Sequence, residues 1–304
     1  MTGTAIVAAS LLAVAIRAGE DRMLTTSHDG IERRYLLHVP ASYDSLRQWP
    51  LVFVLHGGGG TASSVARLTR FSRKADKAGF VAVYPEAVNR HWNDGRRVRR
   101  FRAHREEVDD VGFIAALIDR LARGLSIDTA RVYATGISNG GMMCHRLGCE
   151  LSGRIAAIAP VAASVPALLL DSCRPKRAVS VLAINGTADR LVPFEGGGVG
   201  LLKKRGLVLS VAQTVAAWVR ANGCTAGPDT VLLPDVDPDD GTRVRRETWT
   251  GGSNGSEVVL YTVDGGGHTW PDGTARARQF GRTCRDIDAT ELIWQFFQQH
   301  PGEE

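Results

Sequence analysis

The sequence lacks the features that mark several classes of protein. Its 304 residues include only five cysteines, too few for a disulfide scaffold, and no Cys-x-x-Cys pair or His/Cys cluster has the spacing of a metal site. The longest apolar run, residues 5–16, is shorter than the roughly 20 residues that cross a bilayer, so we expect no stable membrane insertion. With 44% hydrophobic and 23% charged residues, the chain has the composition of a globular protein, which excludes disorder, collagen and coiled coil.

The excess of positive charge comes from one segment of the chain. The formal net charge is +5, from 37 basic and 32 acidic side chains. Residues 90–105, the basic segment, contain seven arginines and a single acid, Asp94, and this segment alone accounts for the excess. No helix-turn-helix, zinc-finger or ribonucleoprotein-type pattern accompanies it, so we expect no nucleic-acid partner and interpret the segment as a solvated loop.

The amino-terminal region resembles a secretory signal. The apolar run is followed by Arg17 and further charged residues, but no Lys or Arg precedes it, so a buried strand or helix, or a start codon assigned too early, are alternatives. We therefore divide the chain into a signal peptide or flexible segment over residues 1–22 and a catalytic domain over residues 23–304. The expected location is secreted or in the cell envelope, with a cytoplasmic location as the alternative.

An oxidising compartment permits disulfides. Cys149 and Cys173 are the candidate pair, whereas Cys144, Cys224 and Cys284 have no assigned partner.

Short apolar segments alternate with longer segments that have helical periodicity. We predict strands at residues 35–39, 51–56, 80–84, 131–135, 155–161, 179–185 and 258–263. We predict helices at residues 63–78, 108–123, 140–151, 209–221 and 289–299. The alternation predicts an α/β fold with a mostly parallel central sheet and helices on both faces. Residues 225–255, rich in Pro, Gly and Asp, are expected to form an irregular excursion with one hairpin rather than a second domain.

A G-x-S-x-G motif lies between a predicted strand and a predicted helix. In Gly136-Ile137-Ser138-Asn139-Gly140, the two glycines let the turn pack tightly, which strains the backbone of Ser138 and exposes its hydroxyl above the sheet. The helix that follows directs its free amides and positive dipole end toward that hydroxyl. The motif is common by chance, but this context is typical of a nucleophilic serine.

A nucleophilic serine needs a histidine base and an acid that orients it. His145 lies within the nucleophile helix and His300 in the last turn of the final helix, so His268, in a glycine-rich loop after an apolar strand, is the expected base. Asp189 follows another apolar strand at the carboxyl end of the sheet, where ligands collect, and is the expected acid. Asp264 is its competitor, four residues before the histidine.

A second glycine-rich loop follows the predicted strand at 51–56. In His56-Gly57-Gly58-Gly59-Gly60 the absent side chains let a backbone amide approach a developing oxyanion, and we expect Gly58 and Asn139 to supply the two amides. No Gly-Lys-Ser/Thr follows, which excludes a phosphate-binding P-loop, and no ribose-binding acid ends the next strand, which excludes a dinucleotide site. We expect no cofactor.

These residues resemble the secreted polyhydroxybutyrate depolymerase and feruloyl esterase-like hydrolases of the α/β-hydrolase fold. The resemblance spans roughly residues 33–297, and its landmarks, in chain order, are residues 55–58, 92–95, 108–113, 136–140, 185–189 and 266–271. Carried over by position, it places the family's triad on Ser138, Asp189 and His268. At 251–252 this chain has glycines where the family often has a cysteine, which removes a partner for Cys224.

Three further features bear on the site. Trp92 and Trp270 are expected either to form walls for a substrate ring or chain or to pack beneath their loops. Asp109 and Asp110 open a helix and are interpreted as a cap. The basic segment departs from the family pattern, and it favours a substrate with a free carboxylate or docking on an anionic surface.

The expected function is a serine carboxylic-ester hydrolase that acts through an acyl-enzyme. Short hydroxyalkanoate esters and feruloyl or acetyl esters, as small molecules or oligomers, are the expected substrates. A serine peptidase and a non-catalytic binding protein that keeps the same fold are the alternatives. Nothing in the sequence specifies the oligomeric state.

Overall fold

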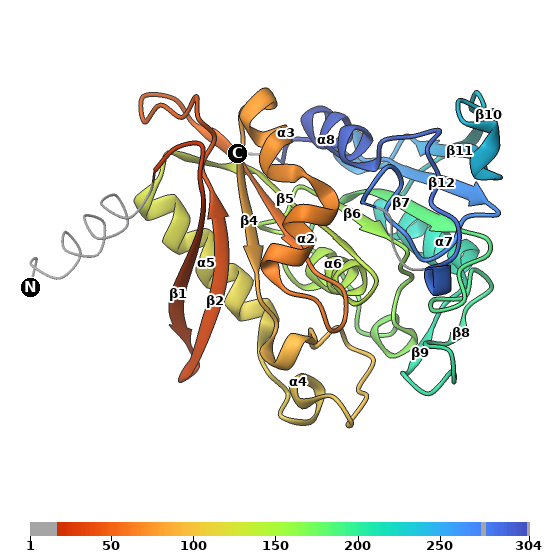
Figure 1. Cartoon of the computed structure of the whole chain (residues 1–304), viewed down its shortest axis with the longest axis horizontal. Coiled ribbons are helices and arrows are strands. Elements are labelled where there is room, and N and C mark those ends of the chain that lie inside the picture. The colour runs from red at the N-terminus through yellow and green to blue at the C-terminus, as the bar shows by residue number, and fades with distance from the viewer. Residues whose placement is uncertain (1–16, 275–277, 303–304) are drawn as a thin grey trace, which may run out of the picture.

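The computed structural model describes residues 17–274 and 278–302 (Figure 1). The apolar run of the expected signal falls on residues outside this part of the chain. Within the described residues, no helix is long and apolar enough to span a membrane.

A ten-stranded sheet runs through the molecule (Figure 1). In spatial order its strands are β1 (Asp21–His28), β2 (Ile31–His38), β4 (Val81–Pro85), β3 (Trp49–Leu55), β5 (Ile127–Ile137), β6 (Ala157–Val161), β7 (Ser180–Gly186), β12 (Val258–Asp264), β11 (Arg243–Thr250) and β10 (Ala226–Leu232). Neighbouring strands are parallel from β4 to β12 and antiparallel at both ends. The prediction of a mostly parallel sheet is therefore confirmed.

Helices cover both faces of this sheet, as predicted. The helices α5 (Asp110–Gly124), α6 (Asn139–Glu150) and α7 (Val211–Asn222) pack on one face. On the other face lie α2 (Ala62–Thr69), α3 (Phe71–Ala78) and α8 (Ala289–Gln299). The shorter elements are α4 (Arg102–Arg105), η1 (Val88–Arg90), η2 (Ala167–Leu169), η3 (Pro238–Asp240), η4 (Ser253–Gly255), η5 (Arg278–Phe280), and a two-stranded ribbon of β8 (Gly197–Gly198) and β9 (Leu207–Val208).

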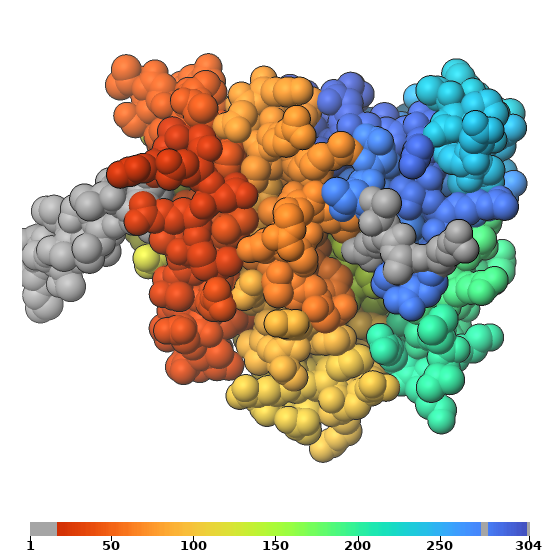
Figure 2. Space-filling view, in the orientation of Figure 1, coloured from red at the N-terminus to blue at the C-terminus, as the bar shows by residue number. Residues whose placement is uncertain are grey.

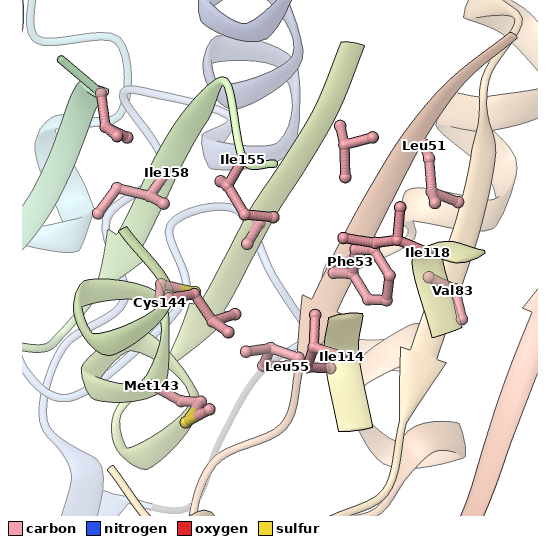
Figure 3. Close-up of a cluster of buried hydrophobic side chains, with 14 of the residues drawn as sticks. Leu51, Phe53, Leu55, Val83, Ile114, Ile118, Met143, Cys144, Ile155 and Ile158 are labelled. Atoms are coloured by element: carbon pink, nitrogen blue, oxygen red, sulfur yellow. The ribbon is translucent and has the colours of Figure 1, made fainter. Parts of the chain in front are cut away.

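Strand β3 shows why the central strands are apolar throughout. Leu51, Phe53 and Leu55 face the core beneath α5 and α6, and Figure 3 shows Phe53 and Leu55 beside side chains of α5. Val52 and Val54 face the opposite core, beneath α2 and α3. Because side chains of a strand alternate between faces and both faces are covered, every position of β3 is buried.

Four features differ from the sequence-based expectation. The single helix expected at 63–78 is two helices, because Arg70 adopts a left-handed conformation (φ 57°) and its N–H closes α2 on the carbonyl of Ala66. The edge strand β1 begins at Asp21, inside the segment expected to be a signal or flexible; its exposed, polar residues hide the strand pattern. Residues 225–255 do contain the expected hairpin, but its strands β10 and β11 extend the main sheet. The basic segment, expected to be a solvated loop, includes the short helix α4.

The predicted disulfide is present. Cys149, at the end of α6, is bonded to Cys173, 24 residues along the chain. Cys144 and Cys284 are buried free thiols, and Cys224 is a half-buried one.

Candidate active site

Four loops leave the sheet at the carboxyl ends of β3, β5, β7 and β12. Because these strands are parallel, their loops meet at one edge. They carry, in chain order, the glycine-rich loop, Ser138, Asp189 and His268. The topology thus brings together segments up to about 200 residues apart in the sequence.

Ser138 stands on a strained turn between β5 and α6. Its backbone has φ 59° and ψ −121°, which L-residues rarely adopt, and its N–H donates to the carbonyl of Val161 at 2.9 Å. The flanking glycines are required: a Cβ on Gly136 would lie 2.6 Å from the carbonyl oxygen of Leu55, and one on Gly140 would lie 2.4 Å from the same atom. The elbow is therefore held by close backbone packing, as its motif predicts.

His268 and Asp189 form a buried pair. The distance from Nδ1 of the histidine to Oδ2 of the aspartate is 2.7 Å, and the side chains are 3% and 2% exposed. The other carboxylate oxygen, Oδ1, accepts the backbone N–H groups of Leu191 (2.8 Å) and Val192 (2.9 Å). The backbone N–H of His268 donates to Phe280. Each partner is fixed by its own loop, so the orientation of the imidazole is set before any substrate binds.

The competing residues are engaged elsewhere. Asp264 accepts from the Thr187 hydroxyl on an exposed turn. His145 is buried, and its Nδ1 accepts from the indole of Trp218; burial lowers the pKa of this histidine to about 3. His300 donates to the carbonyl of Phe296 in the last turn of α8. None of the three lines the cavity described next.

The predicted nucleophile Ser138 and base His268 both line a cavity of about 640 Å³. Ser138 is half-buried, and Gly58 and Asn139 also line this cavity. No hydrogen bond among the described residues joins the Ser138 hydroxyl to His268; catalytic hydrogen bonds are commonly loose before substrate binds. The volume lies in the range typical of small-molecule sites.

The peptide between Gly57 and Gly58 is oriented by two donors. The carbonyl of Gly57 accepts from Nδ1 of His56 (2.8 Å) and from the N–H of Gly60 (2.9 Å). Since C=O and N–H point in opposite directions across a trans peptide, the Gly58 N–H faces away from these donors. It makes no hydrogen bond to any described residue, so an acceptor in the cavity can take it.

His56 is a neutral imidazole with a defined tautomer. Its Nε2 accepts the backbone N–H of Ala87 (3.1 Å), so the ring proton is on Nδ1, where it serves the Gly57 carbonyl. Burial lowers the pKa of His56, which keeps the ring neutral at physiological pH. His56 is therefore a positioning residue for the Gly58 amide.

Replacing His56 with alanine is expected to lower kcat by about 100-fold, because loss of one oxyanion donor costs roughly 100- to 1,000-fold and the loop keeps its Gly60 contact. KM is expected to change by only a few-fold. The matched variant His56→Asn retains an N–H donor near the Nδ1 position and should recover most of the loss in steady-state ester hydrolysis. Equal loss in both variants, with folding intact, would contradict the positioning role.

Behind the serine, a buried polar network holds the residue that follows it. The Asn139 side chain accepts from the N–H of Trp92 (2.9 Å) and donates to Asp94 (2.6 Å). Burial raises the pKa of Asp94, but the guanidinium of Arg96, 2.7 Å away, outweighs it and lowers that pKa below its usual value. Arg96 also donates to the backbone carbonyl of Arg205 (2.7 Å). The first turn of α6 is thereby tied to the cavity wall.

This network corrects the interpretation of the basic segment as solvated for Arg96 and His104, while the other six arginines are exposed as expected. The Arg96 side chain is only 3% exposed, because Asp94 balances its charge. His104 is also buried: its Nε2 donates to the carbonyl of Trp92 (2.9 Å), and its Nδ1 accepts from Val98 (2.9 Å). Five of the sixteen residues of the segment are buried, whereas six of its seven arginines remain exposed.

The two tryptophans expected as substrate walls do not reach the cavity. Trp92 is fully buried, with its indole N–H on the carbonyl of His56, and Trp270 is 1% exposed, with its indole N–H on Thr290. Neither ring lines the cavity. Both pack beneath their loops, which corrects the expectation of substrate contact.

Asp109 and Asp110 have different roles. Asp109 caps α5 by accepting the N–H of Gly112, as predicted. Asp110 is instead fully buried, and its carboxylate pairs with Arg33 (2.6 Å) and accepts from Asn93 (2.7 Å). It supports the loop that carries the buried network, and the cap interpretation applies to Asp109 alone.

Sequence reasoning missed one wall of the cavity. Residues 199–205, between β8 and β9, contribute Val199, Leu201, Leu202, Lys204 and Arg205 to the lining. Leu201 and Leu202 are 66% and 80% exposed. In the sequence, two leucines and two lysines follow each other between two glycines, but no periodicity identifies such a loop as part of a site.

Two groups of described side chains are close enough to one another to hold a metal ion, one around Asp109 and one around Cys284. Neither group lines the cavity.

The fold and this site define an α/β-hydrolase. Residues 33–167 match the family model described as esterase PHB depolymerase. The candidate esterase NocK of Nocardia uniformis subsp. tsuyamanensis is 34% identical over 277 residues, which cover 88% of this chain and 79% of NocK. The chain therefore belongs to the polyhydroxybutyrate depolymerase and feruloyl esterase-like family, as its motifs suggested.

Other relatives agree with this placement. Feruloyl esterase B of Piromyces equi is 27% identical over 79% of this chain, which spans only 43% of that longer protein. Among solved structures, an acetyl xylan esterase from Aspergillus awamori superimposes with a TM-score of 0.58 at 14% identity, covering 82% of this chain and 94% of that one. A ferulic acid esterase from Anaeromyces mucronatus gives 0.53 at 16% identity, covering 92% and 90%. These two likenesses support the fold.

Proposed function

We propose that this protein is a serine carboxylic-ester hydrolase with Ser138 as nucleophile, His268 as base and Asp189 as the orienting acid. The observation that carries the proposal is the buried 2.7 Å pair of His268 and Asp189 at the same cavity as a serine on a strained elbow. The esterase relatives support the same reaction class.

In the proposed reaction, the Ser138 oxygen attacks the ester carbonyl carbon while its proton passes to Nε2 of His268. The tetrahedral intermediate collapses as the C–O bond to the alcohol breaks, and the imidazolium returns the proton to the leaving oxygen. Water then attacks the acyl-enzyme by the same route and releases the acid. Asp189 stabilises the imidazolium that forms twice in each cycle.

The negative charge of each intermediate is assigned to the amides of Gly58 and Asn139. Neither N–H makes a hydrogen bond to a described residue. The loop of Gly58 is held from behind by His56, and the first residue of α6, Asn139, is held by Asp94. Preorganised donors of this kind need no rearrangement during the reaction. The positive end of α6 adds to the same field.

The proposed substrates are short hydroxyalkanoate esters or feruloyl and acetyl esters, as small molecules or oligomers. A serine peptidase that recognises a free substrate amine would need an acidic group, and no described residue lining the cavity is acidic. A non-catalytic binding role has no observation in its favour. The Cys149–Cys173 disulfide supports an oxidising location, secreted or in the cell envelope.

The test uses the purified protein with 4-nitrophenyl butyrate, methyl ferulate and a hydroxybutyrate dimer. We expect hydrolysis of at least one ester, and complete inactivation by diisopropyl fluorophosphate with a single adduct on the peptide that contains Ser138. Inactivation with the adduct on another residue, or no hydrolysis of any ester together with no adduct, would refute the proposal.

A further inference from the structure

We propose that the cavity selects esters that carry a free carboxylate, which is held by Arg100, Lys204 and Arg205. This inference rests on the proposed esterase function and names a substrate class within it. All three side chains line the cavity that contains Ser138, and no described residue of that lining is acidic.

These three cations differ from Arg96, the fourth one at the cavity. The charge of Arg96 is taken up by Asp94. Arg100, Lys204 and Arg205 form no ion pair with any described residue; the guanidinium of Arg100 lies 5.2 Å from the ring of Phe101. Their charge is therefore available to a ligand.

The cations come from two segments that the fold holds together. Arg96 of the basic segment donates to the backbone of Arg205, and a Cβ on Gly206 would lie 2.8 Å from Val98. Figure 2 shows the yellow surface around residue 100 next to the green surface around residue 200, at one edge of the molecule. Side chains about 100 residues apart therefore act on one opening.

One cation of this wall, Arg205, acts on a histidine that packs against the proposed oxyanion loop. The Nε2 atom of His91 lies 2.7 Å from the position that a Cβ on Gly58 would take, so His91 packs on the proposed oxyanion loop. Burial lowers the pKa of His91 to about 4, and the nearby charges of Arg96 and Arg205 contribute to that decrease. His91 is therefore neutral at pH 7, and the uncompensated positive charge at the cavity belongs to Arg100, Arg205 and Lys204.

A carboxylate matches this arrangement in charge. Guanidinium groups bind planar carboxylates through two parallel hydrogen bonds, and Lys adds a further donor. Because the three side chains are exposed at the rim, the attraction is expected to weaken with ionic strength. A neutral ester gains none of this interaction.

The basic segment offers a matched control for net charge. Arg97 and Arg99 are exposed, form no ion pair with a described residue and do not line the cavity. The double variant Arg100→Gln/Arg205→Gln and the control Arg97→Gln/Arg99→Gln each remove two positive charges. The first double variant removes charges that line the cavity, whereas the control removes charges that lie outside it.

The experiment compares kcat/KM for charged and neutral partners of similar size. One pair places the carboxylate on the acyl side: 4-nitrophenyl hydrogen glutarate and 4-nitrophenyl butyrate. The other places it on the alcohol side: 3-butyryloxybutanoate and its primary amide. For at least one pair, we expect the Arg100/Arg205 variant to lower the charged-to-neutral ratio by roughly 3- to 30-fold, the combined range for two ion pairs of exposed side chains. The control should stay within about twofold, and 0.5 M NaCl should lower the wild-type ratio.

The outcomes separate this inference from the proposed function. If both pairs keep an unchanged ratio while Ser138-dependent hydrolysis persists, carboxylate selection is refuted and the esterase function stands. If the two double variants lower the ratio equally, the charges act at long range or in docking to an anionic surface, which also refutes the inference. Absence of any Ser138-dependent hydrolysis refutes both.

Discussion

Replacing Ser138 with alanine is expected to lower kcat for ester hydrolysis by about 10⁶-fold, to the residual rate that binding and oxyanion stabilisation alone provide. The variant loses the oxygen that forms the acyl-enzyme, while the backbone strain at φ 59° remains the same for alanine as for serine. Steady-state hydrolysis of the preferred ester, with active-site titration of the wild type, measures the ratio.

The control for this variant is Ser27→Ala, on the exposed face of the edge strand β1. It removes a hydroxyl far from the cavity and should retain wild-type kcat. Far-UV circular dichroism of both proteins establishes that each is folded. A Ser138→Ala protein that is folded and retains more than a tenth of wild-type activity would contradict the assignment of Ser138 as the nucleophile.

The Asp189→Asn variant is expected to reduce kcat by about 10⁴-fold at neutral pH. The backbone amides of Leu191 and Val192 hold one side-chain oxygen of residue 189, so the amide nitrogen of asparagine would face Nδ1 of His268. That nitrogen donates, so the imidazole would carry its proton on Nε2 and lose the lone pair that receives the serine proton.

Asp264→Asn is the matched control for Asp189→Asn. It makes the same chemical change at the competing acid, whose carboxylate accepts, among the described residues, from the Thr187 hydroxyl alone. We expect activity within a few-fold of wild type. A large loss in Asp264→Asn together with a small one in Asp189→Asn would reverse the assignment of the acid.

Structural features are predicted best from the sequence where the contact that shapes the structure also restricts which residue types occur locally. The central strands are apolar because both faces are covered, and the elbow glycines are required by contacts with the neighbouring strand β3, so motif and structure agree there. The meeting of Ser138, Asp189 and His268 follows from the parallel connections, which return each loop to one edge of the sheet.

Other features depend on contacts that no local pattern encodes. The left-handed break at Arg70 coincides with an ion pair to Asp272, 202 residues away, and helical periodicity continues across it. Trp92 lies in a loop, where periodicity does not say which way a ring points; in the structure the ring is buried and its indole N–H donates to the carbonyl of His56. The burial of Arg96 in the basic segment depends on Asp94, two residues earlier, but composition alone made both look solvated.

The anchor between Arg96 and residue 205 has a consequence for how this enzyme can diversify. The guanidinium of Arg96 donates to a main-chain carbonyl, so this hydrogen bond does not depend on which side chain is present at position 205. Substitutions along 199–205 can therefore change the side chains that line the cavity, while the hydrogen bonds that hold the first turn of α6 behind Ser138 are retained. Residues 199–205 are therefore a suitable region for a combinatorial library. Single substitutions there are expected to change substrate preference while the variants remain active.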